Sequence, residues 1–270
     1  MTTEELIAAR RAEPWREALR KSKKNKERTD IPRVEMNELD AEYRSHTRLE
    51  EVNLGLTKEQ AIQEAQRCLD CPNPTCMQGC PVSINIPTFV KNIERGEFLE
   101  AAKVLKETSA LPAVCGRVCP QEKQCESKCI HLKMGKPAVA IGYLERFAAD
   151  YERESGNISV PEVAEKNGIK IAVVGSGPAG LSFAGDMAKR GYDVTVFEAL
   201  HEIGGVLKYG IPEFRLPNKI VDVEIEGLRK MGVKFLTNCI VGKTISYDDL
   251  HTDGFKGIFA ASGAGLPNFM

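Results

Sequence analysis

Eight of the nine cysteines in this 270-residue sequence fall into two short groups, and their spacing constrains the fold more than any other feature. The first group has the spacing C-x2-C-x4-C-x3-C-P over residues 68–81. The second group contains Cys115, Cys119, Cys125 and Cys129. Thiolates are soft ligands that suit both zinc and iron–sulfur clusters, so the spacing has to separate these two kinds of metal site.

Zinc modules usually place two ligand pairs on either side of a long gap. The first group is instead a close variant of the ferredoxin run C-x2-C-x2-C-x3-C-P, in which the cysteine before proline binds a different cluster from the other three. The spacing therefore favours two [4Fe-4S] clusters over a zinc site or unmetallated core cysteines. By this logic Cys68, Cys71 and Cys76 share one cluster, Cys80 belongs to the other, and the second group completes both.

The last ligand position has two candidates on residue chemistry alone. Four thiolates for each cluster require Cys115. A helix expected from about residue 138 to residue 151, however, places Glu145 on an apolar face. A carboxylate is a poorer match for cluster iron than a thiolate, although it would alter the reduction potential of that cluster. Chemistry alone favours a different role, in which Glu145 pairs with Arg146 or Arg117 at the surface.

Composition limits the kinds of partner. Lys and Arg number 37 against 38 Asp and Glu, for a formal charge of −1, so no overall field attracts nucleic acid or an anionic membrane. The first residues lack the order of a secretory signal, and no apolar run approaches the ~20 residues needed to span a bilayer. We expect a cytoplasmic protein, and a reducing compartment favours metal-bound cysteines over disulfides.

The first 155 residues are expected to form a helical domain. Residues 1–60 are dense in charge and predict surface with one short early helix, and the basic run 21–28 predicts a solvated helix face. Thr57 and Gln60 fit a capping box at the start of a helix that leads to Cys68. Two short helices are expected over residues 86–96 and 97–108.

Residues 156–168 are polar and are interpreted as a linker, after which the pattern changes to that of an α/β domain over residues 169–270. A strand at 169–174, a helix at 179–190 and a strand at 193–197 predict a right-handed βαβ unit. Further along, we expect a helix at 219–231 and strands at 233–236 and 257–261.

The sequence G-x-G-x-x-G follows the first strand of this unit and opens its helix, which is the context that makes this motif specific. Gly175 permits the tight turn, Gly177 lets the backbone approach a pyrophosphate, and Gly180 permits close helix packing. Glu198 ends the second strand 23 positions after Gly175, and its carboxylate suits ribose hydroxyls. An acidic residue there favours FAD or NAD over NADP. The loop residues taken as cofactor-binding are Gly175, Ser176, Gly177, Pro178, Ala179 and Gly180.

Two further stretches favour FAD. Gly204 and Gly205 follow Glu198 closely, as in a second loop over the same phosphates, and Gly263 follows a late strand where small residues permit close approach of a ligand. Arg215 and Val241 complete the candidate cofactor-binding residues.

With both motifs, the chain resembles the small subunit (beta chain) of NADPH-dependent glutamate synthase and its relatives over nearly all of residues 30–270. The most specific parts are residues 68–81, 115–120, the loop from Gly175, and 204–217. The relatives include the large subunit of NADH-dependent reduced ferredoxin:NADP oxidoreductase and the N-terminal part of dihydropyrimidine dehydrogenase. The fold implied is a helical double-cluster ferredoxin domain followed by a partial Rossmann-type FAD-binding domain.

The resemblance also implies the ligands. One cluster in these relatives has a Glu or Gln ligand on the helix after the second cysteine group, and the matching position here is Glu145. The resemblance therefore favours Glu145 over Cys115 as the last cluster ligand. The implied ligand sets are Cys68, Cys71, Cys76 and Cys129 for one cluster, and Cys80, Cys119, Cys125 and Glu145 for the other.

The implied function is electron transfer from NADPH or NADH through FAD and two clusters to a large catalytic subunit or a ferredoxin-type partner in a hetero-oligomer. The relatives continue into an NAD(P)H-binding domain that this sequence does not contain, so we expect a partial chain. No catalytic side chain is expected, because the cofactors supply the chemistry. The alternatives are a reduced ferredoxin:NADP oxidoreductase subunit and, in another class, a zinc-stapled interaction module with a nucleotide-binding domain.

Overall fold

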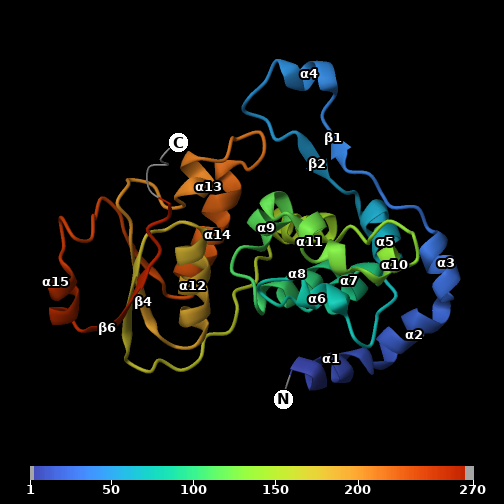
Figure 1. Cartoon of the computed structure of the whole chain (residues 1–270), viewed down its shortest axis with the longest axis horizontal. Coiled ribbons are helices and arrows are strands. Elements are labelled where there is room, and N and C mark those ends of the chain that lie inside the picture. Colours follow the sequence, from blue (N-terminus) through green and yellow to red (C-terminus); the bar gives the residue numbers. More distant parts are fainter. Residues whose placement is uncertain (1–2, 265–270) are drawn as a thin grey trace. The chain divides into compact units, whose positions relative to one another are not determined.

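A computed structural model describes residues 3–264, and the chain divides into two units (Figure 1). The first unit runs to Ser159 except for residues 47–51, which group with the second unit from Val160 onward. Within the described residues, no helix has the length and apolar character needed to cross a bilayer.

The first unit is helical apart from one short antiparallel sheet of two strands. Its early elements are α1 (Thr3–Arg11), α2 (Pro14–Ser22), α3 (Asn25–Asp30), β1 (Asn37–Glu38), α4 (Ala41–Ser45) and β2 (Asn53–Gly55). Its later elements are α5 (Lys58–Gln66), α6 (Thr75–Gln78), α7 (Ile86–Glu94), α8 (Phe98–Lys106), α9 (Pro112–Val118), α10 (Ile130–Lys133) and α11 (Ile141–Ser155), with short 3-10 turns at Gln121–Lys123 and Glu126–Lys128.

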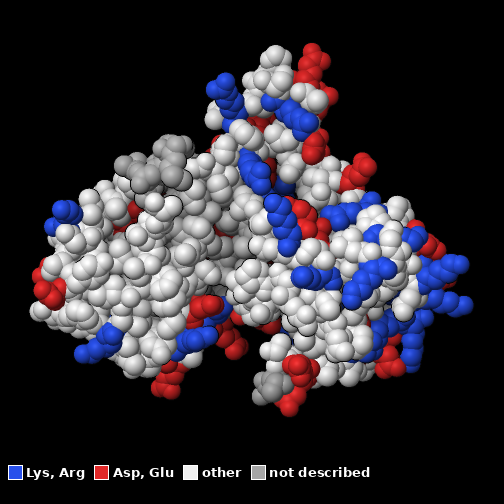
Figure 2. All heavy atoms as spheres, in the orientation of Figure 1, with Lys and Arg blue, Asp and Glu red and all other residues white. Residues whose placement is uncertain are grey.

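The prediction of one short helix in a surface segment is wrong for the first 60 residues. Helices α1, α2 and α3 occupy most of residues 3–30, and Arg16 and Arg28 are each only 1% exposed. The basic run divides between two environments. Lys21, Lys24 and Lys26 are exposed, and Figure 2 shows Lys and Arg gathered over this part of the helical unit, whereas Arg28 turns inward to bind carboxylate and carbonyl oxygens.

The capping box at Thr57 is confirmed. Its Oγ1 accepts a hydrogen bond from the backbone N–H of Gln60 at 3.2 Å, and the Gln60 side chain accepts one from the Thr57 N–H at 2.9 Å. This reciprocal pair satisfies two of the free N–H groups at the start of α5. Helix α5 ends at Gln66, two residues before Cys68, so the capped helix leads the chain to the first cysteine.

Helix α11 is the centre of the helical core and packs on α9, α8, α7 and α5. Phe98 on α8 meets Phe147 edge to face, with ring centroids 5.0 Å apart, and it also contacts Tyr151. Gly116 lets α9 approach α11, because a Cβ there would lie 2.6 Å from the backbone of Arg146. Cys125 belongs to the buried apolar cluster, and four further thiols lie at its edge: Cys68, Cys76, Cys80 and Cys129.

The second unit is a parallel sheet with helices packed on it, and the expected βαβ unit is present. Its elements are β3 (Lys170–Val174), α12 (Pro178–Lys189), β4 (Asp193–Phe197), α13 (Val206–Tyr209), α14 (Asn218–Lys230), β5 (Lys234–Leu236), α15 (Tyr247–Thr252) and β6 (Phe255–Ala260). Strand β3 pairs with β4 from Lys170↔Asp193 to Val174↔Phe197, and α12 packs on both strands.

The strand order β5-β4-β3-β6 makes the ends of β3 and β6 a switch point. From β3 the chain moves outward to β4 and β5, and then returns to the other side of β3 as β6. Ligands of open parallel sheets bind beyond the carboxyl ends of the strands at such a point. The glycine motif follows β3, so the fold places it there.

Candidate metal centres and dinucleotide site

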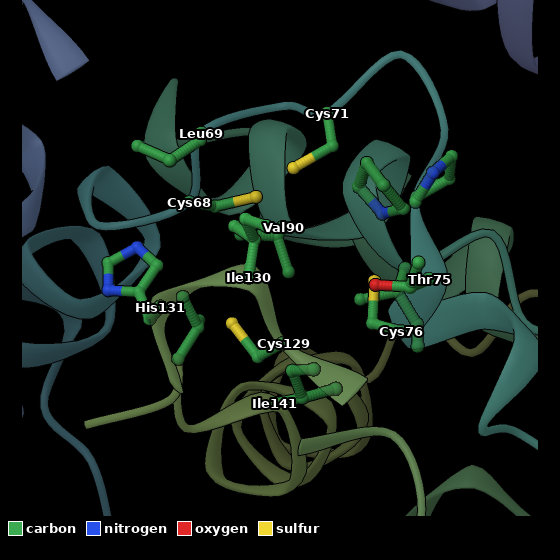
Figure 3. A pocket seen from close by; sticks show the side chains of 14 residues that line it. Cys68, Leu69, Cys71, Thr75, Cys76, Val90, Cys129, Ile130, His131 and Ile141 are labelled. Carbon is green, nitrogen blue, oxygen red and sulfur yellow. The ribbon is translucent and has the colours of Figure 1, made fainter. Parts of the chain in front are cut away.

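Four cysteines from three segments line one pocket of the helical unit: Cys68, Cys71, Cys76 and Cys129. Figure 3 shows the sulfur atoms of Cys68, Cys71 and Cys129 directed toward the same space. Apolar side chains such as Val90 and the imidazole of His131 form much of the remaining wall. The structure thus gathers the four residues of the first expected ligand set around one cavity of mainly apolar surface.

Local structure explains the positions of these thiols. Cys68 follows α5, Cys76 lies on α6, and Cys129 immediately precedes α10. Between Cys68 and Cys71 the chain reverses through Asp70, whose φ of 53° is left-handed. Asp is one of the few non-glycine residues that adopt this conformation readily.

Burial makes the unmetallated thiols weak acids. It raises the pKa of Cys68 to about 11, an effect that the nearby Lys91 ammonium opposes. Burial also raises the pKa of Cys76 well above its usual range, and the neighbouring thiols add to the shift. A metal binds the thiolate, so uptake must release these protons, and the positive charge of the metal offsets the cost of burying several anions.

The second expected ligand set also lies together. Burial raises the pKa of Cys119 to about 11, and the next largest contributions come from the Glu145 carboxylate and from Cys80. The pKa of Cys125 rises further, first through burial, then through Glu126, Glu145, Cys80 and Cys119. These mutual effects require proximity, so Cys80, Cys119, Cys125 and Glu145 form a second group of acidic side chains.

Glu145 is 5% exposed on α11, so it does not lie at the surface, and its pairing with Arg146 or Arg117 stays a prediction. Both arginines also contact Asp150: Arg117 Nη2 lies 2.8 Å and Arg146 Nε 3.3 Å from its Oδ2. Cys115 is half-buried on α9, and its carbonyl oxygen accepts a hydrogen bond from the Gln121 side chain at 2.7 Å.

Four thiols around a cavity are compatible with an iron–sulfur cluster, which has several metal atoms, each bound to one protein ligand. Among residues 3–264, no three His, Cys, Asp or Glu side chains converge on one point.

In the second unit, the glycine motif is shaped by close backbone packing. Gly175 has a φ of 102°, and a Cβ there would lie 2.4 Å from the carbonyl oxygen of Ala261, just beyond β6. A Cβ on Gly180 would lie 2.0 Å from the carbonyl oxygen of Gly175. At Gly177, by contrast, a Cβ would meet nothing within 4 Å. The first and last glycines therefore serve the fold, and the middle one leaves open space at the start of α12, which begins with Pro178 and Ala179.

Glu198 connects the two glycine-rich loops. Its Oε2 accepts hydrogen bonds from the backbone N–H of Ser176 at 2.8 Å and from the Ser176 hydroxyl, and its Oε1 accepts from the N–H of Leu200 at 2.8 Å. The Ser176 Oγ in turn accepts from the N–H of Gly204 at 2.9 Å. A carboxylate has about four acceptor positions, so Glu198 retains capacity for a ribose hydroxyl.

The second loop lies against the first, because a Cβ on Gly205 would be 2.9 Å from the Cα of Gly177. Gly263 follows β6 with a φ of 75° and open space around it. Arg215 is exposed in a turn after α13, and Val241 packs against an apolar cluster that includes Phe197. The structure therefore brings the glycines, Ser176 and Glu198 together, but it places Val241 against the core.

Sequence reasoning missed several charged residues beside the first pocket. Lys91 is fully buried on α7, and its Nζ donates to the carbonyl oxygen of Cys68 at 2.6 Å. Asp70 is also fully buried and binds Arg16. His131 is 1% exposed, and its Nε2 lies 3.0 Å from the carbonyl oxygen of Arg67. No local signal marks Lys91, since the residues about one helical turn away on either side, Thr88 and Glu94, are polar.

Comparison with known proteins agrees with both units. Residues 44–157 match the family described as dihydropyrimidine dehydrogenase domain II, 4Fe-4S cluster. Residues 173–231 match the NAD(P)-binding Rossmann-like domain. The helical unit is therefore a 4Fe-4S ferredoxin-type domain, and the second is a Rossmann-like dinucleotide-binding domain.

Curated relatives combine the same two parts. The chain is 39% identical over 224 residues to the NAD-dependent dihydropyrimidine dehydrogenase subunit PreT of Escherichia coli O157:H7, covering 82% of this chain and 54% of the relative. It is 39% identical over 205 residues to the NADPH glutamate synthase small chain of E. coli K12, covering 76% and 43%. The small chain from Azospirillum brasilense is 35% identical over 200 residues, covering 74% and 42%. The chain thus spans about half the length of the curated relatives it matches.

Proposed function

Because this chain belongs to the same family as the glutamate synthase small chains and the PreT subunits, we propose that it is the electron-transfer part of an NAD(P)H-dependent oxidoreductase. The observation that carries this proposal is the pocket lined by Cys68, Cys71, Cys76 and Cys129 in a domain of the 4Fe-4S type. Soft thiol donors around an apolar cavity suit a cluster that exchanges electrons without proton chemistry on the protein.

We assign two [4Fe-4S] clusters to the helical unit. One is held by Cys68, Cys71, Cys76 and Cys129. The other is held by Cys80, Cys119, Cys125 and Glu145, with Cys115 as the alternative to the glutamate. The mutual electrostatic effects among Cys80, Cys119, Cys125 and Glu145 support the second set. Apolar packing around both sets limits the access of water, which is one determinant of a cluster's reduction potential.

We assign FAD to the Rossmann-like unit. The N-terminus of α12 offers free N–H groups to a pyrophosphate, Gly177 leaves room for its approach, and Glu198 is positioned for a ribose. The Gly204–Gly205 loop, tied to Ser176, lies beside the same space. When bound, FAD would accept a hydride from NADPH or NADH and release single electrons to the clusters. The protein's part is to bind, orient and shield these groups.

The first candidate role is that of the small subunit of glutamate synthase, which delivers electrons to a large catalytic subunit for glutamate formation. The second is a PreT-type subunit of a dihydropyrimidine dehydrogenase, favoured by alignments that cover more of this chain. A subunit of NADH-dependent reduced ferredoxin:NADP oxidoreductase remains a further oxidoreductase alternative. All three place this chain in a hetero-oligomer, with the hydride donor bound outside the Rossmann-like unit described above.

The proposal is tested by purifying the chain without oxygen and measuring iron, sulfide, zinc and flavin. We expect about eight iron and eight sulfide per chain, from two four-iron clusters, and visible absorption that bleaches with dithionite. Stoichiometric zinc in a colourless protein would instead establish the zinc-stapled alternative. Adding FAD or NAD to flavin-free protein then determines which dinucleotide the second unit binds.

A further inference from the structure

The first pocket rests on buried charged side chains to which the proposed function gives no role. Lys91 Nζ donates to the Cys68 carbonyl oxygen and to the Glu94 carboxylate. Glu94 also accepts a hydrogen bond from Arg28 Nη1 at 2.8 Å. All three charged side chains are buried, so their charges are poorly screened by solvent.

A second part of this set surrounds Asp70, which lies between the ligands Cys68 and Cys71. Its carboxylate accepts hydrogen bonds from Arg16 Nε at 3.0 Å and from Arg20 Nη1 at 2.7 Å. We define the buried charge layer as Arg16, Arg20, Arg28, Lys91, Asp70 and Glu94. It contains four cations and two carboxylates, which leaves two positive charges in excess beside the first pocket.

The charged side chains beside the second ligand set are paired. Glu126 is buried next to Cys125 in the sequence, and it accepts hydrogen bonds from Arg33 Nη2 at 2.8 Å and from the Gly142 N–H at 3.2 Å. The buried side chains of Arg117 and Arg146 both contact Asp150. The effect of the buried charge layer therefore concerns the first ligand set alone.

We propose that the buried charge layer raises the reduction potential of the cluster held by Cys68, Cys71, Cys76 and Cys129. Reduction adds one negative charge, which nearby buried cations stabilise and nearby carboxylates destabilise. Lys91 is the main positioning residue, because it binds the carbonyl of a ligand cysteine. This inference rests on the proposed function, since it requires the first cluster.

The test is a redox titration of the anaerobically purified full chain, followed by electron paramagnetic resonance. The Cys76→Ser and Cys119→Ser variants assign the signals to the two clusters. The decisive variant is Lys91→Met, with Lys91→Arg as the charge-preserving control and Lys103→Met as the control for an exposed lysine. Iron content and circular dichroism verify that each variant is loaded and folded.

Lys91→Met should lower the midpoint potential of the first cluster by at least about 59 mV, a tenfold change in a one-electron equilibrium, without moving the potential of the second cluster. Lys91→Arg and Lys103→Met should leave both potentials in place. A first cluster whose potential is unmoved in loaded Lys91→Met overturns the inference and leaves the proposed function intact. A wild-type chain without iron overturns both.

Two further variants keep the inference testable if Lys91→Met does not load with iron. Arg20 is 20% exposed, so Arg20→Met removes a cation of the layer at smaller structural cost. Glu94→Gln removes a carboxylate of the same layer at similar volume. The potential of the first cluster should fall in Arg20→Met and rise in Glu94→Gln. Equal potentials in these two variants and the wild type would contradict the proposed effect of charge.

Discussion

Arg16 Nε lies 3.0 Å from Oδ2 of Asp70, and both side chains are buried although they stand 54 positions apart in the sequence. The pair attaches helix α2 to the turn between Cys68 and Cys71. Arg16 also donates to the Thr88 hydroxyl at 2.7 Å, so one guanidinium joins α2, the cysteine turn and α7. The N-terminal helices thereby become part of the support of the first pocket.

Replacing Arg16 with alanine should lower the free energy of unfolding of the helical unit by about 3 kcal/mol, the lower end of the range for breaking a buried pair, because Arg20 still binds Asp70. Urea unfolding followed by the fluorescence of the single tryptophan measures this loss of stability. Trp15 lies on α2, and the centroid of its ring is 3.8 Å from Cζ of Arg95. The control variant is Lys21→Ala, which removes the exposed ion pair between Lys21 and Glu17. It should lower the free energy of unfolding by less than about 1 kcal/mol. Equal losses in both variants would show that burial adds nothing to the Arg16 pair.

Replacing Glu145 with alanine should abolish or alter the second cluster, because we assign its carboxylate to iron there. Iron content should fall toward about four per chain, and the electron paramagnetic resonance signal of the first cluster should persist. Cys115→Ala should leave both signals unchanged, and Glu154→Ala, at an exposed glutamate on the same helix, is the matched control. If Cys115→Ala perturbs the second cluster and Glu145→Ala does not, the thiol is the ligand.

Replacing Gly177 with alanine should leave the Rossmann-like unit folded but weaken dinucleotide binding at least tenfold, or about 1.4 kcal/mol. An added Cβ meets no protein atom within 4 Å, and the φ of −66° suits any residue. The methyl group would instead occupy space needed by the pyrophosphate. Flavin titration measures the affinity, and the melting temperature reports the fold. Gly227→Ala, at another glycine with open space, should keep full affinity; unchanged affinity in Gly177→Ala as well would place the pyrophosphate elsewhere.

Replacing Thr57 with alanine should lower the free energy of unfolding by about 1 kcal/mol, because the start of α5 loses its side-chain cap. The Gln60 side chain would still accept from the N–H of residue 57, so only one half of the capping box is removed. Thermal unfolding of the helical unit measures the loss, and Thr57→Ser, which keeps the hydroxyl, should restore stability. A loss equal in both variants would attribute the effect to the methyl group and not to the cap.

The sequence predicted those features that depend on short-range pattern. The Thr57–Gln60 box, the order strand, glycine loop, helix and strand after residue 168, and the inward position of Glu145 all follow from local spacing. The need for glycine at positions 175 and 180 could also be predicted from the motif, because a Cβ at either position would collide with a backbone carbonyl oxygen.

The N-terminal helices were not predictable in the same way. Their stability comes from Arg16 and Arg28, whose partners Asp70 and Glu94 lie 54 and 66 positions away. Long-range ion pairs leave no periodic signal in sequence, so a charged segment of this kind reads as solvated surface. The same reason hid Lys91, whose role depends on the carbonyl of Cys68.

Helix α6 has a consequence for electron flow between the proposed clusters. It is only four residues long, it contains Cys76, which lines the first pocket, and it ends two residues before Cys80, which belongs to the second group. Four residues of helix rise about 6 Å. One ligand of each proposed cluster thus lies within five consecutive residues, 76–80, so this short segment limits how far apart the two clusters can lie. A short separation favours fast electron tunnelling from one cluster to the other.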